Sequence, residues 1–198
     1  MRLERNHYRK GFLLLLGILL FTAGLSCCVG RYPLTLRDLW QICTGGMEDG
    51  IKSNVFLRIR LPRTVFAGLT GAALSISGLV YQELFRNPLV SPDVLGAGGG
   101  AGVGAVCAIV CGGGAVSVRS SALAGGLLAV ALALFLSSLI GSYGGSGRHS
   151  AGMVLAGIAV KALADAAVMA LKYTADPSRQ LPSIDYWLMG SLQNIHWA

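Results

Sequence analysis

Charged side chains are scarce in this sequence, and their scarcity excludes an ordinary soluble domain. Only 13% of the 198 residues are Asp, Glu, Lys or Arg, whereas soluble domains carry about 25%. Apolar residues make up 54% of the chain before its 28 glycines are counted. Because so little polar surface cannot cover a globule in water, the composition predicts that lipid surrounds much of the chain. The basic residues behind the net charge of +7 are scattered between apolar runs, which argues against a nucleic-acid partner.

Motifs of common catalytic and metal-binding sites are also absent. The sequence has no G-x-x-x-x-G-K-[ST] phosphate-binding loop and no G-x-S-x-G or H-E-x-x-H pattern. His7, His149 and His196 lie in terminal or loop positions, with no cysteine or carboxylate at ligand spacing. The five cysteines form no C-x-x-C pair, and Cys107 and Cys111 share a helical face without a further ligand nearby. We therefore predict no catalytic residues, no metal site and no cofactor.

Long apolar runs are the main feature that the sequence does contain. A helix needs about 20 apolar residues to cross the ~30 Å hydrocarbon core of a bilayer. Five runs reach that length, at about residues 11–30, 64–85, 94–118, 120–140 and 151–173. A shorter apolar stretch, 187–198, is interpreted as the start of a sixth helix. The predicted fold is an all-α polytopic transmembrane bundle, with the whole chain forming the N-terminal part of one membrane domain.

The first apolar run has a second interpretation. A basic start followed by an apolar run is typical of a signal peptide. This run is longer than the usual 7–15-residue signal core, and no A-x-A cleavage site follows it. We therefore interpret it as an uncleaved span.

Small residues at helical spacing indicate where the helices pack on one another. Gly71 follows Ala67 by one turn, and Gly96, Gly100 and Gly104 form a G-x-x-x-G-x-x-x-G series. In lipid, such residues let helix backbones approach closely. The same series contains G-x-G-x-x-A, a relaxed dinucleotide-binding pattern, but no strand precedes it and no acidic residue lies about 20 positions further on. We therefore predict a helix-packing role for the four glycines.

Two charges lie inside the run 151–173. Lys161 and Asp165 are one helical turn apart near its middle. Charges within a span are costly and by default mark a functional or water-lined site. At this spacing they could instead neutralise each other, although lysine before the acid is the weaker order. A self-satisfied pair and a pathway-lining role both remain open.

An arginine cluster, Arg58, Arg60 and Arg63, precedes the second run. Arginine forms bidentate pairs with carboxylates, so the cluster would suit an acidic partner protein, while the alternative is contact with lipid phosphates. With the N-terminus in the cytoplasm, the cluster lies outside. That orientation leaves six basic residues on cytoplasmic segments and nine on outer ones, against the usual inside excess, but the basic start of the chain favours it.

A polar turn follows the second run and contains Asn87, Pro88, Pro92 and Asp93. Each proline biases the residue before it away from helical geometry, and Asn and Asp are turn formers. The segment therefore predicts a short hairpin loop between two spans.

These motifs together resemble a known family. R-L-P-R at 60–63, N-P-L at 87–89, S-P-D-x-L-G at 91–96 and the glycine series after them are similar to the signature of FecCD-like permeases. Those proteins are the membrane subunits of ABC importers for iron–siderophore, haem and cobalamin. The resemblance runs from Arg58 to about Trp197. It implies that Arg60 and Arg63 receive glutamates of a substrate-binding protein, and that the turn at 87–93 is a cytoplasmic signature loop.

The resemblance also implies a function and partners. The chain would be a permease subunit of a binding-protein-dependent importer for such chelates, multi-pass in the bacterial inner (plasma) membrane, and not itself an enzyme. Its partners would be a second permease subunit, two cytoplasmic ATPase subunits that hydrolyse ATP, an extracytoplasmic substrate-binding protein and membrane lipid. The chain resembles only the N-terminal part of such a permease, and we expect it to be incomplete. The alternative is a non-transport membrane protein, either a scaffold or an intramembrane enzyme using Lys161 and Asp165.

Overall fold

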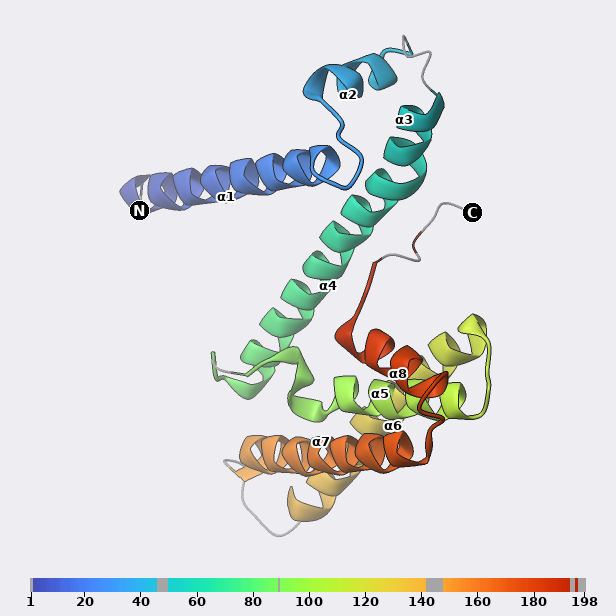
Figure 1. Cartoon of the computed structure of the whole chain (residues 1–198). Coiled ribbons are helices and arrows are strands. Elements are labelled where there is room, and N and C mark those ends of the chain that lie inside the picture. The colour runs from blue at the N-terminus through green and yellow to red at the C-terminus, as the bar shows by residue number, and fades with distance from the viewer. Residues whose placement is uncertain (1, 46–49, 89, 142–147, 193–194, 196–198) are drawn as a thin grey trace. The chain divides into compact units, whose positions relative to one another are not determined.

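The computed structural model describes residues 2–45, 50–88, 90–141, 148–192 and 195 (Figure 1). All regular secondary structure in these ranges is helical, which confirms the all-α prediction for this part of the chain. The chain divides into two compact units, Met1–Ala72 with Leu192–Ala198, and Ala73–Ser191. Each unit is described by itself.

The first unit begins with the long helix α1, Arg2–Cys28. The short helices α2, Leu36–Cys43, and α3, Gly50–Asn54, follow. A π-helical turn, η1 (Val55–Arg60), then leads into α4, Leu61–Phe85, so that helical structure runs without a break from Gly50 to Phe85.

The second unit contains the end of α4 and a bundle of four further α-helices. The 3-10 turn η2, Pro92–Leu95, introduces it. The helices are α5 (Ala97–Val110), α6 (Ala115–Gly141), α7 (Arg148–Thr174) and α8 (Gln180–Met189).

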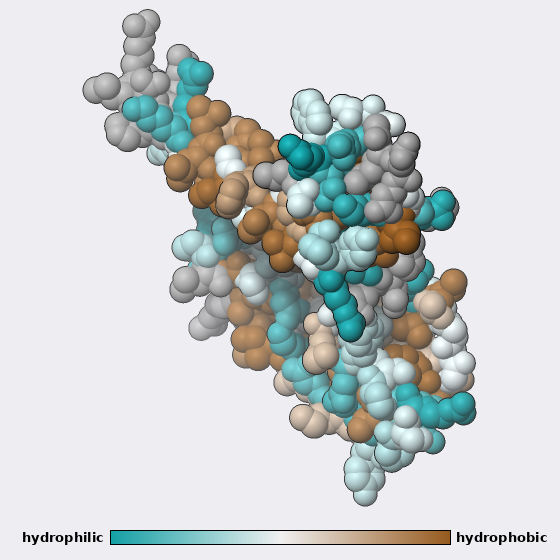
Figure 2. All heavy atoms as spheres, turned by 45° about the horizontal axis from the view of Figure 1, so that its top comes forward, coloured by the Kyte–Doolittle hydropathy of each residue, from teal (hydrophilic) through white to brown (hydrophobic). Residues whose placement is uncertain are grey.

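Four of the described helical stretches are long and apolar enough to cross a bilayer. They are Tyr8–Cys28, Gly50–Phe85, Ala115–Leu139 and Gly152–Thr174, and they correspond to the predicted runs 11–30, 64–85, 120–140 and 151–173. Their large apolar side chains are widely exposed, and Figure 2 shows an uncovered hydrophobic surface along α1 with hydrophilic residues at its N-terminal end. A surface of this kind is what a lipid environment requires.

The third predicted span, 94–118, is wrong in its bounds. The helix there, α5, has 14 residues and is about 21 Å long at ~1.5 Å per residue, short of the ~30 Å hydrocarbon core. It ends because Gly112 adopts the left-handed conformation with φ +73°, and the N–H of Gly113 bonds back to the carbonyl of Ala108 at 2.8 Å. This is the usual glycine termination of a helix, and a new helix, α6, starts at Ala115.

The predicted start of a sixth helix at 187–198 also needs correction. The segment forms α8 instead, which begins earlier, at Gln180, and ends at Met189 before Gly190 with φ +77°. Ser191, Leu192 and Ile195 are described and are not helical. The remaining residues of the predicted segment lie outside the described part of the chain.

Helix α5 forms the core of the second unit, and its glycines allow α6 to approach within backbone contact. A Cβ on Gly104 would lie 2.0 Å from the carbonyl oxygen of Ser121, and one on Gly100 would lie 2.4 Å from the carbonyl oxygen of Gly125. Neither position has room for a side chain. At Gly71, in contrast, an added Cβ would meet nothing within 4 Å.

Candidate functional site

The signature turn begins where α4 ends. Arg86 adopts φ +49°, a left-handed conformation that is uncommon for a residue with a side chain, and the backbone reverses there. The N–H of Asn87 bonds to the carbonyl of Gln82 at 3.1 Å, and the Gln82 side-chain amide donates to the carbonyl of Pro88 at 3.1 Å. Phe85, Val90 and Leu95 anchor the turn, since all three are buried in one apolar cluster with α6 and α7.

Asp93 is the polar centre of this turn. Ser91 is extended with ψ 162°, and Pro92 occupies the first position of η2, where its missing N–H costs nothing. One carboxylate oxygen of Asp93 accepts the N–H of Gly98 in the first turn of α5 at 3.0 Å. The other oxygen forms an ion pair with the ammonium of Lys161 on α7. A single side chain therefore ties η2 to both helices.

The backbone of the turn is seated directly on α7. A Cβ on Gly157 would lie 1.9 Å from the carbonyl oxygen of Val94, and one on Gly96 would lie 3.2 Å from the backbone nitrogen of Lys161. Gly96 also has φ +73°, which only glycine adopts without strain. The two glycines and the ion pair of Asp93 together fix the turn on one face of α7.

The partner of Lys161 is a finding that local spacing did not reveal. Lys161 pairs with Asp93, 68 residues away, and not with Asp165 one turn along the same helix. In the described part of the chain, the Asp165 side chain has no hydrogen bond or ion pair. It lies beside the first turn of α5, where a Cβ on Gly99 would be 3.8 Å from its Oδ1.

The Asp93–Lys161 pair can be tested by a double-mutant cycle. Each single variant removes the ion pair and leaves one of its charges without the other, so the costs of the two single variants should sum to more than the cost of the double variant. We expect a coupling free energy of about 1 kcal/mol, kept modest because the two side chains are 46% and 39% exposed. Thermal unfolding of Asp93→Asn, Lys161→Met and the double variant in one detergent measures it.

The Lys172–Asp185 pair at the end of α7, with an N–O distance of 2.6 Å, is the matched control for this cycle. Because it lies near the helix end, its coupling should be about 0.5 kcal/mol or less. Additive effects of Asp93→Asn and Lys161→Met would show that the central pair has no energetic role.

The three arginines of the cluster differ in their burial. Arg60 is only 8% exposed, and its guanidinium donates to the carbonyls of Cys27 and Cys28, both at 2.7 Å, and to that of Tyr32. These carbonyls belong to the C-terminus of α1 and the chain just after it, where a cation is favoured by the helix dipole. Arg58 is exposed and Arg63 is partly buried. Arg60 therefore binds α1 from within the unit, and Arg58 is the exposed member of the cluster.

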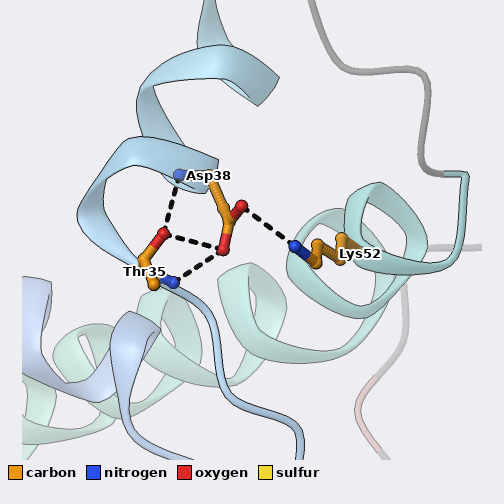
Figure 3. Close-up of polar contacts among 3 residues, drawn as sticks. All are labelled: Thr35, Asp38 and Lys52. Carbon is orange, nitrogen blue, oxygen red and sulfur yellow. Dashed lines mark hydrogen bonds and ion pairs between the residues drawn. The ribbon is translucent and has the colours of Figure 1, made fainter.

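A polar site that the predictions missed lies in the segment before the cluster (Figure 3). Thr35 and Asp38 form a capping box at the start of α2. The Thr35 backbone N–H and its hydroxyl both donate to Asp38 Oδ2 at 2.8 Å, and Lys52 donates to Oδ1 at 3.1 Å. The sequence carried the signal, because Thr35-Leu36-Arg37-Asp38 has the [ST]-x-x-[DE] spacing.

These contacts make Asp38 an unusually strong acid. Hydrogen bonds from the backbone and the hydroxyl of Thr35, and then from Lys52, lower the pKa of Asp38 from 3.8 to about 2. Because the folded pKa is depressed, the stabilising contribution is complete above about pH 4. It is lost as the pH falls from there through about 2.

Removing the Thr35 hydroxyl should reverse part of that shift. In Thr35→Val the backbone bond remains and the hydroxyl bond is lost, so the pKa of Asp38 should rise part of the way toward 3.8. Carbonyl NMR of Asp-labelled protein, titrated between pH 5 and 2, measures it. Asp176 is the internal control, because Ser178 and Arg179 lower its pKa and neither contact changes. An unchanged Asp38 titration would contradict the assignment of the shift to Thr35.

No metal site emerges in the described ranges, where no three His, Cys, Asp or Glu side chains come together. The polar geometry of these residues is one of ion pairs and helix caps. Such contacts position backbone segments.

Comparison with known proteins gives a consistent result. A model described as the FecCD transport family matches residues 17–198. The molybdate import system permease protein MolB of Haemophilus influenzae is 33% identical, over 98% of this chain and 58% of its own length. The hemin transport system permease protein HmuU of Yersinia pestis is 36% identical over 95% and 54%. The vitamin B12 import system permease protein BtuC of Escherichia coli is 34% identical over 98% and 57%.

A solved structure agrees with these relatives. It is described as an inward-facing conformation of a metal-chelate type ABC transporter, and it matches 96% of this chain and 56% of its own with a TM-score of 0.78 and 33% identity. The chain therefore spans a little over half the length of the proteins that it matches.

Proposed function

The chain belongs to the FecCD transport family, and we propose that it acts as the membrane permease subunit of a binding-protein-dependent ABC importer. The observation that carries the proposal is the fold match at 33% identity over 96% of the chain. The four long apolar helical stretches are consistent with a multi-pass membrane subunit, placed here in the bacterial inner membrane. A permease of this type is not itself catalytic, and ATP hydrolysis would reside in a separate subunit.

The proposed substrate is a metal chelate or corrinoid, such as an iron–siderophore, haem or cobalamin. Support comes from relatives named for hemin and vitamin B12 and from the metal-chelate description of the structural neighbour. A further relative is named for molybdate, so family membership by itself does not select the solute.

The proposed mechanism is alternating access. A second permease subunit and two cytoplasmic ATPase subunits would complete the importer, and helices would rearrange around a central passage as the ATPases close and open. In this arrangement the turn 91–96 would move with α5 and α7 as one body, because Asp93 bonds to Gly98 of α5 and to Lys161 of α7.

The rival hypothesis, an intramembrane enzyme using Lys161 and Asp165, has less support. Lys161 is held by Asp93, and a lysine kept charged by a paired carboxylate is poorly suited to act as a base.

The proposal can be tested by isolating the chain with its assembly. A tagged chain, produced in its own host and purified in mild detergent, should bring with it an ATPase subunit and a substrate-binding protein. Recovery of neither, from preparations in which the chain itself is folded, would contradict the importer function.

Docking of the binding protein is proposed for Arg58, which is exposed, and for Arg63, which is partly buried. Arg58→Glu with Arg63→Glu should weaken docking at low salt by at least about tenfold, because like charges across an interface repel. Arg9→Glu is the matched control, an exposed reversal on α1 at its N-terminal end. Surface binding measurements at two salt concentrations distinguish the variants, and equal affinities would remove the cluster from the interface.

A further inference from the structure

The helix that leads into α4 changes its geometry at one place. Between Val55 and Arg60 the backbone forms the π-helical turn η1, with α-helical geometry before it in α3 and after it in α4. The N–H of Leu61 bonds to the carbonyl of Phe56, five residues earlier. Because π turns are rare and are often found at functional sites, this one calls for a physical cause.

Pro62 supplies that cause. It directly follows the last π-helical hydrogen bond, and its side chain is fully buried. A proline inside a helix has no N–H to donate, and its ring clashes with the carbonyl four residues earlier, which here belongs to Arg58. A wider turn just before the proline relieves this clash. The motif R-L-P-R therefore contains both the arginine at which η1 ends and the proline that requires the turn.

The effect of η1 is a change of register along the helix. Lys52 and Arg60 are eight residues apart, which in an unbroken α-helix would place their side chains about 80° apart around the axis. A π turn takes up one residue more than an α-helical turn, and this residue removes about 100° of rotation. The two side chains are then only about 20° apart, so both lie on one face of the helix.

That face binds the segment 27–38, which runs from the end of α1 into α2. Arg60 donates to carbonyls at the end of α1 and just after it. A Cβ on Gly30 would lie 2.6 Å from the Nη2 atom of Arg60, so the glycine leaves room for the guanidinium. Lys52 binds Asp38 Oδ1 at 3.1 Å (Figure 3). The segment is therefore bound at both of its ends from one side of the helix.

We propose that Pro62 is a positioning residue for the segment 27–38. By imposing η1, it brings Lys52 and Arg60 onto one face of the helix, from which both bind the segment. Arg58, two residues before Arg60 and so about half a turn away, is left exposed. Without η1, Lys52 would turn away from the segment, because Arg60 adjoins α4 and keeps its place. This role of the proline goes beyond the proposed transport function and does not depend on it.

The first step of the test removes the cause of the turn. Pro62→Ala supplies the missing N–H and removes the ring, so that η1 becomes α-helical and Lys52 leaves Asp38. The hydrogen bonds from Thr35 remain and the one from Lys52 is lost, so the pKa of Asp38 should rise from about 2 part of the way toward 3.8. Carbonyl NMR of the Asp-labelled full chain in detergent measures it. Lys52→Met should cause the same rise in the original chain and no further rise in Pro62→Ala.

The second step restores the register by another route. Deleting Leu57 from the Pro62→Ala chain places Lys52 and Arg60 seven residues apart, about two turns of α-helix, and should return the pKa of Asp38 to about 2. A deletion would not repair packing lost with the proline ring. Deletion of Ile51 is the matched control, because Ile51 and Leu57 are both exposed apolar residues but Ile51 precedes Lys52 and leaves the spacing unchanged.

Two results would overturn the inference. One is an Asp38 pKa that Pro62→Ala leaves at about 2. The other is a raised pKa that deletion of Leu57 lowers no more than deletion of Ile51 does. Should Pro62→Ala alone not fold, the variant that also lacks Leu57 decides, since it must fold with the original Asp38 titration. None of these measurements involves transport or an ATPase subunit, so failure here and failure of the permease proposal are distinguishable.

Discussion

Gly104→Ala is expected to destabilise the second unit by about 3 kcal/mol, at the upper end of the usual cost of overpacking. The added methyl group would lie 2.0 Å from the carbonyl oxygen of Ser121 and 2.7 Å from its carbonyl carbon. Both are backbone atoms, so no side-chain rotation relieves the overlap and α5 must move away from α6. Thermal unfolding in detergent should show the loss as a clearly lower midpoint.

Gly71→Ala is the matched control for this prediction. Both glycines belong to small-residue series in apolar helices, but a Cβ at Gly71 would meet nothing within 4 Å. Replacing an unpacked helical glycine by alanine should be neutral or stabilise by up to about 1 kcal/mol. An unchanged midpoint for Gly104→Ala would contradict the close α5–α6 packing described above.

Arg60→Met is expected to cost about 3 kcal/mol in the first unit. The side chain is 8% exposed and donates to the carbonyls of Cys27, Cys28 and Tyr32. Hydrogen bonds from a charged group contribute about 1.5–3 kcal/mol, and the carbonyls left behind would be poorly satisfied. Arg60→Lys should recover only part of the loss, because an ammonium cannot reproduce the planar fork of a guanidinium.

Arg58→Met is the control, since Arg58 is exposed and such substitutions usually change stability by less than about 0.5 kcal/mol. Unfolding midpoints and binding-protein affinity should be measured on the same samples. A stable Arg60→Met protein with weakened docking would instead return Arg60 to the interface, as the family resemblance implied.

The long apolar helices were predictable because hydrophobic length alone identifies them. The end of α5 was not. The glycines at 98–100 lie inside a helix and those at 112–114 lie outside one, although the two runs have the same composition. What differs is their surroundings. Gly99 and Gly100 pack against the separate helices α7 and α6. Cβ atoms at Gly112 and Gly114 would meet nothing within 4 Å, and one at Gly113 would meet only residues four or five positions away in the chain, Ser117 and Ala108. Tertiary packing, which sequence spacing does not contain, decides between the two outcomes.

The partners of the longer-range polar contacts could not be predicted from the sequence either. The sequence left open whether Lys161 pairs with Asp165, one turn away, and the structure pairs Lys161 with Asp93 across 68 positions. The Arg60 guanidinium likewise donates hydrogen bonds to carbonyls that lie 28 to 33 residues earlier in the chain. The capping box of Thr35 and Asp38, in contrast, can be recognised from the sequence, because its partners are three residues apart.

The shortness of α5 has a consequence for how the protein would respond to membranes of different thickness. Its 14 residues leave a deficit of about 9 Å against an average hydrocarbon core. At its N-terminal end α5 is continued by η2, which packs against α7, whereas the segment 111–114 at its other end is largely exposed. Because the glycines of α5 bring it into backbone contact with α6 and pack it against α7, hydrophobic matching should be set by these longer neighbours, which have 27 residues each.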